Sequence, residues 1–420
     1  MKSYKPIILH LVSISWGGSY DYTHNIHQNL VNNGYDSFIS IAGRRIITPT
    51  DSSIPIICEK PSLLERLKRK VHRFVMNCLK PNIDIRYAGM NLTERITEHN
   101  PHDLLNAMPV TPDVIMVHWV SGYANAKYVN DLQKATGAKV YYIMIDEAIL
   151  SGCCHYPWDC IGYMNGCKNC KITNSRILKH LIRKNYKFKE RYLVQEKNVI
   201  YPTTFDYIRL MKSPLWRGAN TYKLIESIDE SLFCPTNDCL SLRKKFEIPE
   251  GKRVVMFGCS HLNEPRKGIS LLISALKIIN RNDIIFFAVG NDTIPELDKQ
   301  VIYTGHVDMA TLAQTYQIAD LFVCSSLEDS GPQMINMSIM SGTPVVAFEM
   351  GVALDIVHHG KSGYLAKLYE IDDLVKGINE ILDLSDAEYK QMCQYCRDLA
   401  LSTFSYDKQT EFFNNLLNNI

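Results

Sequence analysis

Short apolar runs alternate with segments of helical spacing along the first third of the chain. The run Ile7–Val12 leads into a Gly-Gly turn, a helical segment and Gly34, a residue type that commonly ends a helix. The next apolar run, Asp36–Ala42, completes a strand–helix–strand unit, and this spacing predicts parallel strands. The predicted elements here are strands at 7–12, 36–42, 114–118 and 139–145 and helices at about 22–32 and 126–136.

A second series with the same rhythm begins at Arg253–Gly258. Its predicted strands lie at 253–258, 284–290, 301–304, 321–324 and 344–348, and its helices at 269–280 and 309–318. Turn residues cluster at 213–227, between the two series. We therefore predict two doubly wound α/β domains, at 1–220 and 221–403, followed by a C-terminal helix at 404–420 that crosses back to the first domain.

The composition limits the classes of partner. The chain has 420 residues, of which 46% are hydrophobic, enough to fill the cores of two domains. A net charge of +2 gives no overall attraction to nucleic acid, so no nucleic acid is predicted as a partner. The run Ile7–Val12 is interpreted as a strand and not as an export signal, and no apolar run approaches the ~20 residues that span a bilayer. The 13 cysteines are then expected as reduced thiols or metal ligands in a cytoplasmic protein.

Carboxylates and a Gly-Pro loop stand where a predicted strand meets a predicted helix. The residues in question are Glu328, Asp329, Ser330, Gly331 and Pro332. In α/β sheets this edge binds ligands: the N–H groups at the helix start can hold a phosphate, and carboxylates can accept hydrogen bonds from sugar hydroxyls. From these residues alone, the alternative is an ordinary helix cap with solvated charges.

The run Glu328–Pro332, continued by Ser341–Phe348, resembles the retaining glycosyltransferases of the GT-B fold, the large family 4 that also holds bacterial capsule and O-antigen transferases. The resemblance covers nearly the whole chain. It implies two Rossmann-like domains facing each other across a cleft, with Ser330, Gly331 and Pro332 beside the donor. It also implies that Asp329, with Glu328 next to it, holds the donor sugar.

The family places a Glu that binds the nucleotide ribose seven intervening residues after the first carboxylate. In this chain that position is Met337. A thioether cannot accept a strong hydrogen bond, which predicts donor binding weaker by about 2 kcal/mol unless the neighbouring Asn336 compensates.

A cationic loop, Gly258–Gly268, follows the first strand of the second series. In the family an Arg and a Lys of this loop stabilise the departing diphosphate. Lys267 matches the Lys, whereas Cys259-Ser260 replaces the usual Arg and leaves Arg266 as the second cation. Without the resemblance, Arg266 and Lys267 are interpreted as a solvated loop pair.

Three features of the first series resemble the family in the same way. Gly17 and Gly18 follow the first strand, where the family carries a Gly-Gly turn beside the donor phosphate and the acceptor. His118 ends a strand and resembles the family's His that faces the donor sugar, although a lone His is more often structural. Asp146 ends the next strand, where relatives often read His-Asp, and is assigned to the acceptor side.

A Cys-rich stretch within about 151–200 interrupts the strand–helix rhythm and is interpreted as an insertion. The predicted ligands of a structural zinc ion are Cys154, Cys160, Cys167 and Cys170. The last pair has the two-residue gap of a zinc knuckle, and four thiolates leave no open position for water. Free buried thiols and an iron–sulfur cluster are the alternatives. No catalytic metal is expected.

Between Pro61 and Pro81, apolar residues recur at helical spacing among basic ones. Residues 61–80 are therefore predicted to form a basic amphipathic helix, either a domain helix with a solvated face or a surface that rests on anionic lipid. Lipid contact would place the protein at the inner face of the plasma membrane and would suit a lipid-linked acceptor.

The features together predict a retaining hexosyltransferase that moves a sugar from a nucleoside-diphosphate sugar to a glycan or lipid-linked acceptor in surface polysaccharide biosynthesis. A sugar-nucleotide epimerase or a glycan phosphorylase would use the same architecture. The non-enzyme alternative is a degenerate homologue that acts as a binding or scaffold subunit. Three departures from the family motifs motivate it: Met337, the missing Arg of the cationic loop and the missing His before Asp146.

Overall fold

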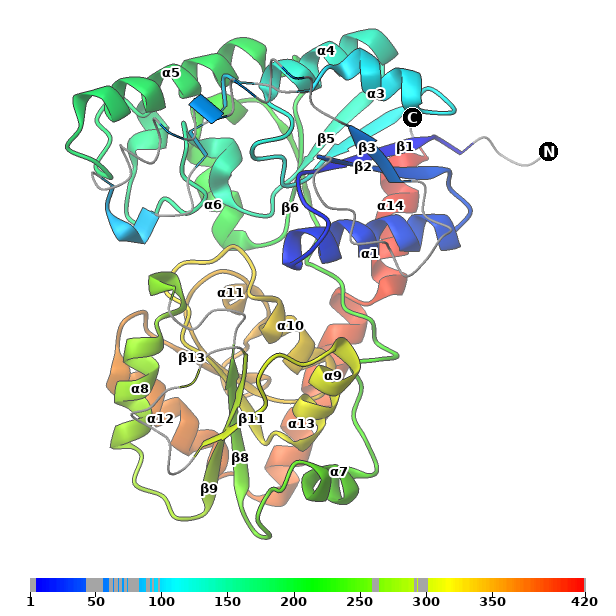
Figure 1. The fold of residues 1–420 in the computed structure, drawn as a ribbon. Helices are drawn as coiled ribbons and strands as arrows, with labels where there is room; N and C mark the ends of the chain where they lie inside the picture. The colour runs from blue at the N-terminus through cyan, green and yellow to red at the C-terminus, as the bar shows by residue number, and fades with distance from the viewer. Residues whose placement is uncertain are drawn as a thin grey trace. The chain divides into compact units, whose positions relative to one another are not determined.

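A computed structural model gives the fold (Figure 1). It describes residues 5–42, 56–59, 63, 67, 70, 71, 74, 83–87, 91, 92, 94–96, 99–258, 264–290, 293 and 301–418. Most of the predicted helix 61–80 lies outside the described residues. The chain divides into two compact units: unit 1 comprises residues 1–202, 206–224 and 409–420, and unit 2 comprises 203–205 and 225–408.

Unit 1 is built on a seven-stranded parallel sheet with the order β3-β2-β1-β4-β5-β6-β7. The strands are β1 Ile8–Val12, β2 Ser37–Ala42, β3 Ile56–Glu59, β4 Val114–Val117, β5 Lys139–Ile143, β6 Asn198–Tyr201 and β7 Asn220–Lys223. The helices and 3-10 turns are α1 Gly18–Asn32, η2 Ile85–Tyr87, α3 Pro101–Ala107, α4 Ala126–Thr136, η3 Glu147–Leu150, η4 Gly162–Asn165, α5 Arg176–Tyr192, α6 Thr204–Lys212, η5 Pro214–Trp216 and α14 Tyr406–Leu417.

Unit 2 repeats this plan with a six-stranded parallel sheet of order β10-β9-β8-β11-β12-β13. Its strands are β8 Arg253–Gly258, β9 Ile284–Val289, β10 Val301–Tyr303, β11 Leu321–Cys324, β12 Val345–Phe348 and β13 Gly363–Ala366. Its helices and 3-10 turns are α7 Cys239–Lys245, η6 Pro265–Lys267, α8 Ile269–Ile278, α9 Met309–Ile318, α10 Gln333–Met340, α11 Ala353–Ile356, α12 Ile371–Leu382 and α13 Asp386–Thr403. The predicted α/β class with parallel strands is confirmed.

Both faces of each sheet are apolar, which is why the strands read as continuous hydrophobic runs. On β4, Ile115 and Val117 pack into the core on one face, whereas Val114 and Met116 pack on the other. Parallel sheets need this because helices cover both faces. In each sheet the order of the strands reverses once, between β1 and β4 in unit 1 and between β8 and β11 in unit 2. Ligands of such sheets bind at the carboxyl ends of the strands next to that point.

The C-terminal helix α14 packs on unit 1, beside α1 (Figure 1). Phe413 and Leu417 of α14 share a core with Tyr22 and Ile26 of α1. The hydroxyl of Tyr35, just after α1, donates to Asn414 Oδ1 at 2.9 Å. Sequence segments at the two ends of the chain therefore complete one domain.

Candidate active site

Two loops of unit 2 meet at the carboxyl edge of its sheet. Lys267 Nζ lies 2.7 Å from Asp329 Oδ2, and Arg266 Nη1 donates to the same oxygen. Arg266 Nε is also 2.8 Å from Glu264 Oε2. The structure thus brings together three of the predicted catalytic residues, and the carboxylate of Asp329 holds both cations.

The two cations keep Asp329 ionised although its side chain is only 10% exposed. Burial on its own would raise the pKa of Asp329, but the charges of Lys267 and Arg266 lower it below its usual value. At neutral pH Asp329 is therefore ionised, and its single negative charge compensates only part of the charge of the two cations.

Backbone contacts fix the two loops together. The amide of Leu327 donates to the Arg266 carbonyl at 2.7 Å, and Ser325 Oγ donates to the Lys267 carbonyl at 2.8 Å. Gly268 has φ +63°, and a Cβ there would lie 2.0 Å from the carbonyl oxygen of Ser325. Only glycine permits this approach, which brings Arg266 and Lys267 to the buried Glu328 and Asp329.

The N-terminus of α10 follows this cluster directly and carries no side-chain cap. Pro332 occupies the cap position, and Gly331 leaves open space around its Cα. The buried hydroxyl of Ser330 has no hydrogen-bond partner among the described residues. Uncapped N–H groups and a free hydroxyl form an arrangement suited to phosphate oxygens.

Residues of α10 hold a carboxylate that the sequence motifs did not indicate. Gln333 Nε2 donates to Glu226 Oε1, and Asn336 Nδ2 donates to the Glu226 carbonyl at 2.8 Å. Met337, where the family has its ribose-binding Glu, is 5% exposed and packs in the hydrophobic core of unit 2. Asn336 is therefore engaged with Glu226, and Glu226 is the carboxylate attached to the first turn of this helix.

At the corresponding edge of unit 1, Gly17 opens α1. It has φ 78° and ψ 172°, and the amides of Tyr20 and Asp21 bond to its carbonyl at 2.9 and 3.0 Å. Gly18 is the first residue of α1, and no side chain caps the helix. The predicted Gly-Gly turn thus leads into a second helix N-terminus with open N–H groups.

His118 ends β4 and begins a buried chain of hydrogen bonds. His118 Nε2 lies 2.8 Å from His10 Nδ1, His10 Nε2 lies 3.1 Å from Ser37 Oγ, and the same hydroxyl lies 2.8 Å from His27 Nδ1. Burial lowers the pKa of His118 to about 3. Burial first, and then the neighbouring histidines, hold the pKa of His10 well below its usual value and that of His27 at about 4. All three rings are therefore neutral at physiological pH.

The tautomer of His10 decides the protonation of His118 Nδ1. Each neutral ring carries one N–H hydrogen, so His10 donates through one ring nitrogen and accepts through the other. If His10 Nδ1 donates to His118 Nε2, His118 Nδ1 bears a hydrogen, and Ser37 donates to His10 and accepts from His27. If His10 Nε2 donates to Ser37 instead, His118 Nε2 donates to His10 and His118 Nδ1 is bare. His118 Nδ1 is buried with no partner in the described structure. The chain thus sets whether this nitrogen donates or accepts.

Asp146 lies at the end of the next strand and is bound by a histidine from the Cys-rich stretch. Its Oδ2 is 2.5 Å from His155 Nδ1, and its Oδ1 accepts from the Ala148 amide at 2.8 Å. His155 Nε2 is 3.2 Å from Ser121 Oγ, and the His155 ring is tilted against that of Trp119 at 5.5 Å. The family resemblance implied a His immediately before this Asp, whereas here His155 supplies an imidazole from another segment.

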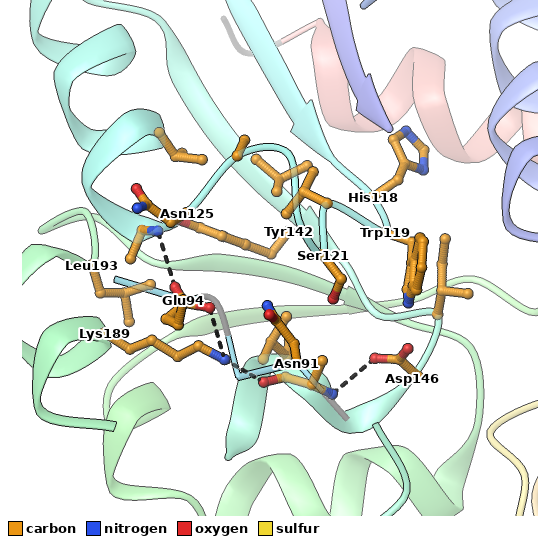
Figure 2. A pocket seen from close by; sticks show the side chains of 18 of the residues that line it. Asn91, Glu94, His118, Trp119, Ser121, Asn125, Tyr142, Asp146, Lys189 and Leu193 are labelled. Atoms are coloured by element: carbon orange, nitrogen blue, oxygen red, sulfur yellow. Dashed lines mark hydrogen bonds and ion pairs between the residues drawn. The ribbon is translucent and has the colours of Figure 1, made fainter. Parts of the chain in front are cut away.

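A cavity of about 70 Å³ opens beside these residues in unit 1 (Figure 2). His118, Trp119, Ser121 and Asp146 line one part of it. Figure 2 shows the ring of His118 away from Asn125 and Glu94, on the opposite side of the view. The inner part is lined by Asn91, Glu94, Asn125, Tyr142, Lys189 and Trp216, among others.

Sequence reasoning did not single out these inner residues. Asn125 stands just before a helix, which is an ordinary position for a cap. Tyr142 lies within an apolar strand, and Lys189 is one of many cations on α5. Only the ion pair of Lys189 with Glu94, 95 residues earlier in the chain, distinguishes them, and sequence spacing does not show it.

The predicted metal ligands share one small cavity. Cys154, Cys160, Cys167 and Cys170 all line it, all are free thiols, and all are at most 8% exposed. The amides of Gly152 and Gly162 donate to the sulfurs of Cys167 and Cys160 at 3.3 and 3.4 Å.

The thiols are nevertheless not arranged as a finished ligand set. Within the described residues, no three or more Cys, His, Asp or Glu side chains have the spacing of a bound metal ion. Burial raises the pKa of both Cys167 and Cys170 to about 12, so that without a cation these groups are protonated.

Part of unit 2 matches a known protein family. Residues 240–398 match the model of the family described as "Glycosyl transferases group 1". A GDP-mannose-dependent alpha-mannosyltransferase of Corynebacterium glutamicum is 26% identical over 170 residues, which are 40% of each chain. The match therefore spans well under half of this curated relative.

Solved structures resemble the whole chain at low sequence identity. Sucrose-phosphate synthase from Thermosynechococcus elongatus has a TM-score of 0.69 at 16% identity and covers 98% of both chains. Anabaena Alr3699/HepE in complex with UDP-glucose has a TM-score of 0.66 at 15% identity, covering 99% of this chain and all of that one. The fold is of the GT-B type. Across the described part of the chain, no helix is long and apolar enough to cross a membrane.

Proposed function

From the match of residues 240–398 to the family described as "Glycosyl transferases group 1", we propose that this protein is a retaining glycosyltransferase that uses a nucleoside-diphosphate sugar. The observation that carries the proposal is the cluster of Arg266, Lys267 and Asp329 next to the uncapped N-terminus of α10. Two cations and open helix amides at the carboxyl edge of a parallel sheet form a site for a diphosphate.

In this proposal the diphosphate competes with Asp329 for the two cations. Lys267 and Arg266 stabilise the charge that grows on the departing diphosphate, while the N–H groups of α10 and the hydroxyl of Ser330 bind its oxygens. Asp329, once released from part of its ion pairing, and the adjacent Glu328 accept hydrogen bonds from the sugar hydroxyls. Glu226 takes the role of the missing carboxylate at Met337 and binds the ribose.

The retaining outcome follows from the family resemblance and the chemistry proposed with it. The acceptor hydroxyl attacks on the face that the diphosphate leaves, and a phosphate oxygen takes the hydroxyl proton. The anomeric C–O bond to the diphosphate breaks as the new bond to the acceptor oxygen forms. No metal takes part.

The acceptor is proposed to be a glycan or a lipid-linked glycan of a surface polysaccharide, capsule or O-antigen, bound at the edge of unit 1 near His118 and Asp146. Four apolar side chains of the segment 61–80 support contact with lipid. Leu63, Leu67, Val71 and Phe74 are 82%, 60%, 59% and 71% exposed, and the intervening sequence is basic. Such a face suits the anionic inner leaflet of the plasma membrane, with the protein in the cytoplasm.

A structural zinc ion at Cys154, Cys160, Cys167 and Cys170 remains a proposal. The shared cavity and the N–H···S bonds support it, and the thiols would have to move closer together to bind the ion. Metal analysis of reduced, chelator-free protein should give about one equivalent of zinc, lost in Cys167→Ser but kept in Cys153→Ser. Less than about half an equivalent of metal in the wild type would argue against the site.

The function is tested by thermal stabilisation of the purified protein with UDP-, GDP-, dTDP- and ADP-sugars. A ligand that binds the native state raises apparent stability, so one nucleotide class should raise Tm. Lys267→Ala should lose that shift, measured against its own ligand-free Tm, whereas Lys277→Ala, an exposed lysine of α8, should keep it. No shift with any donor would contradict the proposal. A shift without turnover on any acceptor would favour the scaffold alternative.

A further inference from the structure

The cavity of unit 1 extends well beyond the edge where His118 and Asp146 lie. Its volume of about 70 Å³ is several times the roughly 10–15 Å³ that one water occupies on this measure. Trp119, Ser121 and Asp146, which follow β4 and β5, line one part of it, and residues of α4 and α5 line another part. A ligand group at the proposed acceptor edge can therefore reach inward.

Two neutral polar groups in the cavity wall have no partner in the described structure. Asn125 caps α4 with its Oδ1, which accepts from the Tyr128 amide at 2.9 Å. The cap requires an acceptor, so it fixes the amide orientation and leaves Nδ2 as the free end, a donor. The Tyr142 hydroxyl, on β5, is also unpartnered. Both residues are more than nine-tenths buried, at 6% and 5% exposure.

Glu94 and Lys189, two charged residues of the cavity wall, are paired with each other. Glu94 Oε2 lies 3.5 Å from Lys189 Nζ, and Glu94 Oε1 accepts from the Ala126 amide at 3.2 Å (Figure 2). Lys189 Nζ also donates to the carbonyls of Ala148 and Ser151 at 2.6 and 3.0 Å. The charges of Glu94 and Lys189 compensate each other, so this part of the cavity favours an uncharged group.

Much of the remaining wall is apolar. It includes Val120, Ala124, Val129, Ile145, Leu193 and Leu215. A fitting group therefore combines a small apolar part with one oxygen that accepts hydrogen bonds from Asn125 Nδ2 and the Tyr142 hydroxyl.

We propose that this cavity binds the acetamido group of an N-acetylated amino sugar in the acceptor. Its carbonyl oxygen accepts from Asn125 Nδ2 and the Tyr142 hydroxyl, and its methyl group lies against the apolar wall. The proposal rests on the proposed function in that it takes the bound sugar to be the acceptor. It names the class of acceptor: a glycan whose accepting end carries an N-acetylhexosamine.

The test is binding of N-acetylglucosamine and of glucose, which differ only at the substituent of the second carbon. Saturation-transfer NMR on the intact wild-type protein, without any nucleotide sugar, should show transfer to the acetamido methyl of N-acetylglucosamine. Glucose should bind at least about tenfold more weakly, since it lacks the group that the buried polar side chains require. Equal binding of the two sugars, or no binding of either at tens of millimolar, would overturn the proposal.

Variants separate a ligand site from a water-filled cavity. Tyr142→Phe should weaken N-acetylglucosamine binding by roughly two- to tenfold, the range expected for one neutral hydrogen bond. The matched control is Tyr141→Phe, because its neighbouring hydroxyl is also buried and unpartnered but does not line the cavity. Asn125→Asp keeps the helix cap and replaces the donor, so it should abolish binding without loss of α4. If Tyr142→Phe and Tyr141→Phe behave alike, the cavity holds only water.

Failure of the subsite proposal and failure of the proposed function give different experimental results. Sugar binding that follows the predicted variants, in a protein that no nucleotide sugar stabilises, would leave the subsite standing and remove the transferase. Donor binding that depends on Lys267, without discrimination between the two sugars, would support the transferase and remove the subsite.

Discussion

The carboxyl edges of the two sheets share one topology but differ in the charge of the side chains that lie there. In unit 2, Asp329 is buried and ionised, and it is paired with the partly buried Arg266 and Lys267. In unit 1, His10, His27 and His118 are buried and neutral, and the cavity that His118 lines carries an unpartnered amide and an unpartnered hydroxyl. The first edge suits an anion that displaces a carboxylate, and the second suits hydroxyls and other uncharged groups. The same strand order therefore carries two chemically different edges, set by the loops.

The largest expected effect concerns the charged edge. Lys267→Ala should lower the rate of sugar transfer by about 10²–10³-fold, the loss typical when one group that stabilises developing charge is removed. The rate is measured as release of nucleoside diphosphate under saturating donor. Lys277→Ala should stay within twofold of the wild type, and a Lys267→Ala enzyme of normal rate would show that the two edges do not differ in the way described.

The next effect concerns the close approach of the two loops in unit 2. Gly268→Ala should lower the free energy of unfolding by about 3 kcal/mol, because the added Cβ meets the Ser325 carbonyl at 2.0 Å and the backbone has positive φ. Gly305→Ala is the control, since Gly305 has φ +69° but open space around it, and should lose only about 1 kcal/mol. Urea unfolding measures both. Equal losses would mean that the loops are not held at this distance.

The neutral edge predicts a pH dependence of stability. The folded pKa values of His118 and His27, about 3 and 4, lie below the ordinary value of 6.5. Below pH 6.5 the unfolded chain therefore binds protons that the folded chain does not, and stability falls as pH falls. Between pH 6.5 and 5 each such ring lowers the free energy of unfolding by about 2 kcal/mol.

The variant His27→Gln should remove one of these contributions and so flatten the change in unfolding free energy between pH 7 and pH 5. The exposed His180 of α5 serves as the control, and His180→Gln should leave the slope unchanged. A wild-type protein of equal stability at pH 7 and pH 5 would mean that the three rings are not buried in neutral form.

The smallest effect concerns the hydrogen-bond chain itself. Ser37→Ala removes the hydroxyl that joins His10 to His27, which should cost about 1–2 kcal/mol of stability for the partners left unsatisfied. It should also uncouple the tautomer of His118 from His27, seen as changed ¹⁵N shifts of the His118 ring nitrogens. Ser37→Thr keeps a hydroxyl and should restore them. Unchanged shifts in Ser37→Ala would show that the chain does not set the tautomer.

The sequence predicted the fold well because both sheets are buried on two faces. Continuous apolar runs such as Val114–Val117 therefore marked the strands directly. The edge strand β7, with the partly exposed sequence Asn220–Lys223, gave no such signal and lay inside a stretch interpreted as a boundary. This segment forms a strand because it pairs with β6, and its own composition does not indicate one.

For the sites, local motifs indicated residues on one loop but not their partners. The carboxylate–Gly–Pro run and the cationic loop could be read from spacing, and the structure joins them through Asp329. Glu226 and His155 could not, because Glu226 lies outside any motif and the motif around His155 indicated only its cysteines. The sequence indicated that the carboxylate expected at position 337 is missing. The carboxylate that α10 binds is that of Glu226, which lies over a hundred residues earlier in the chain.

The central claim is that the two edges recognise different chemistry, and a crossed calorimetric titration tests it directly. UDP, GDP, dTDP and ADP on one hand, and N-acetylglucosamine on the other, are titrated into the wild type, Lys267→Ala and Tyr142→Phe. The account predicts that Lys267→Ala loses binding of the diphosphate and keeps that of the sugar, whereas Tyr142→Phe weakens the sugar and leaves the diphosphate unchanged. Loss of both ligands in either variant, or of neither ligand in both, would contradict it.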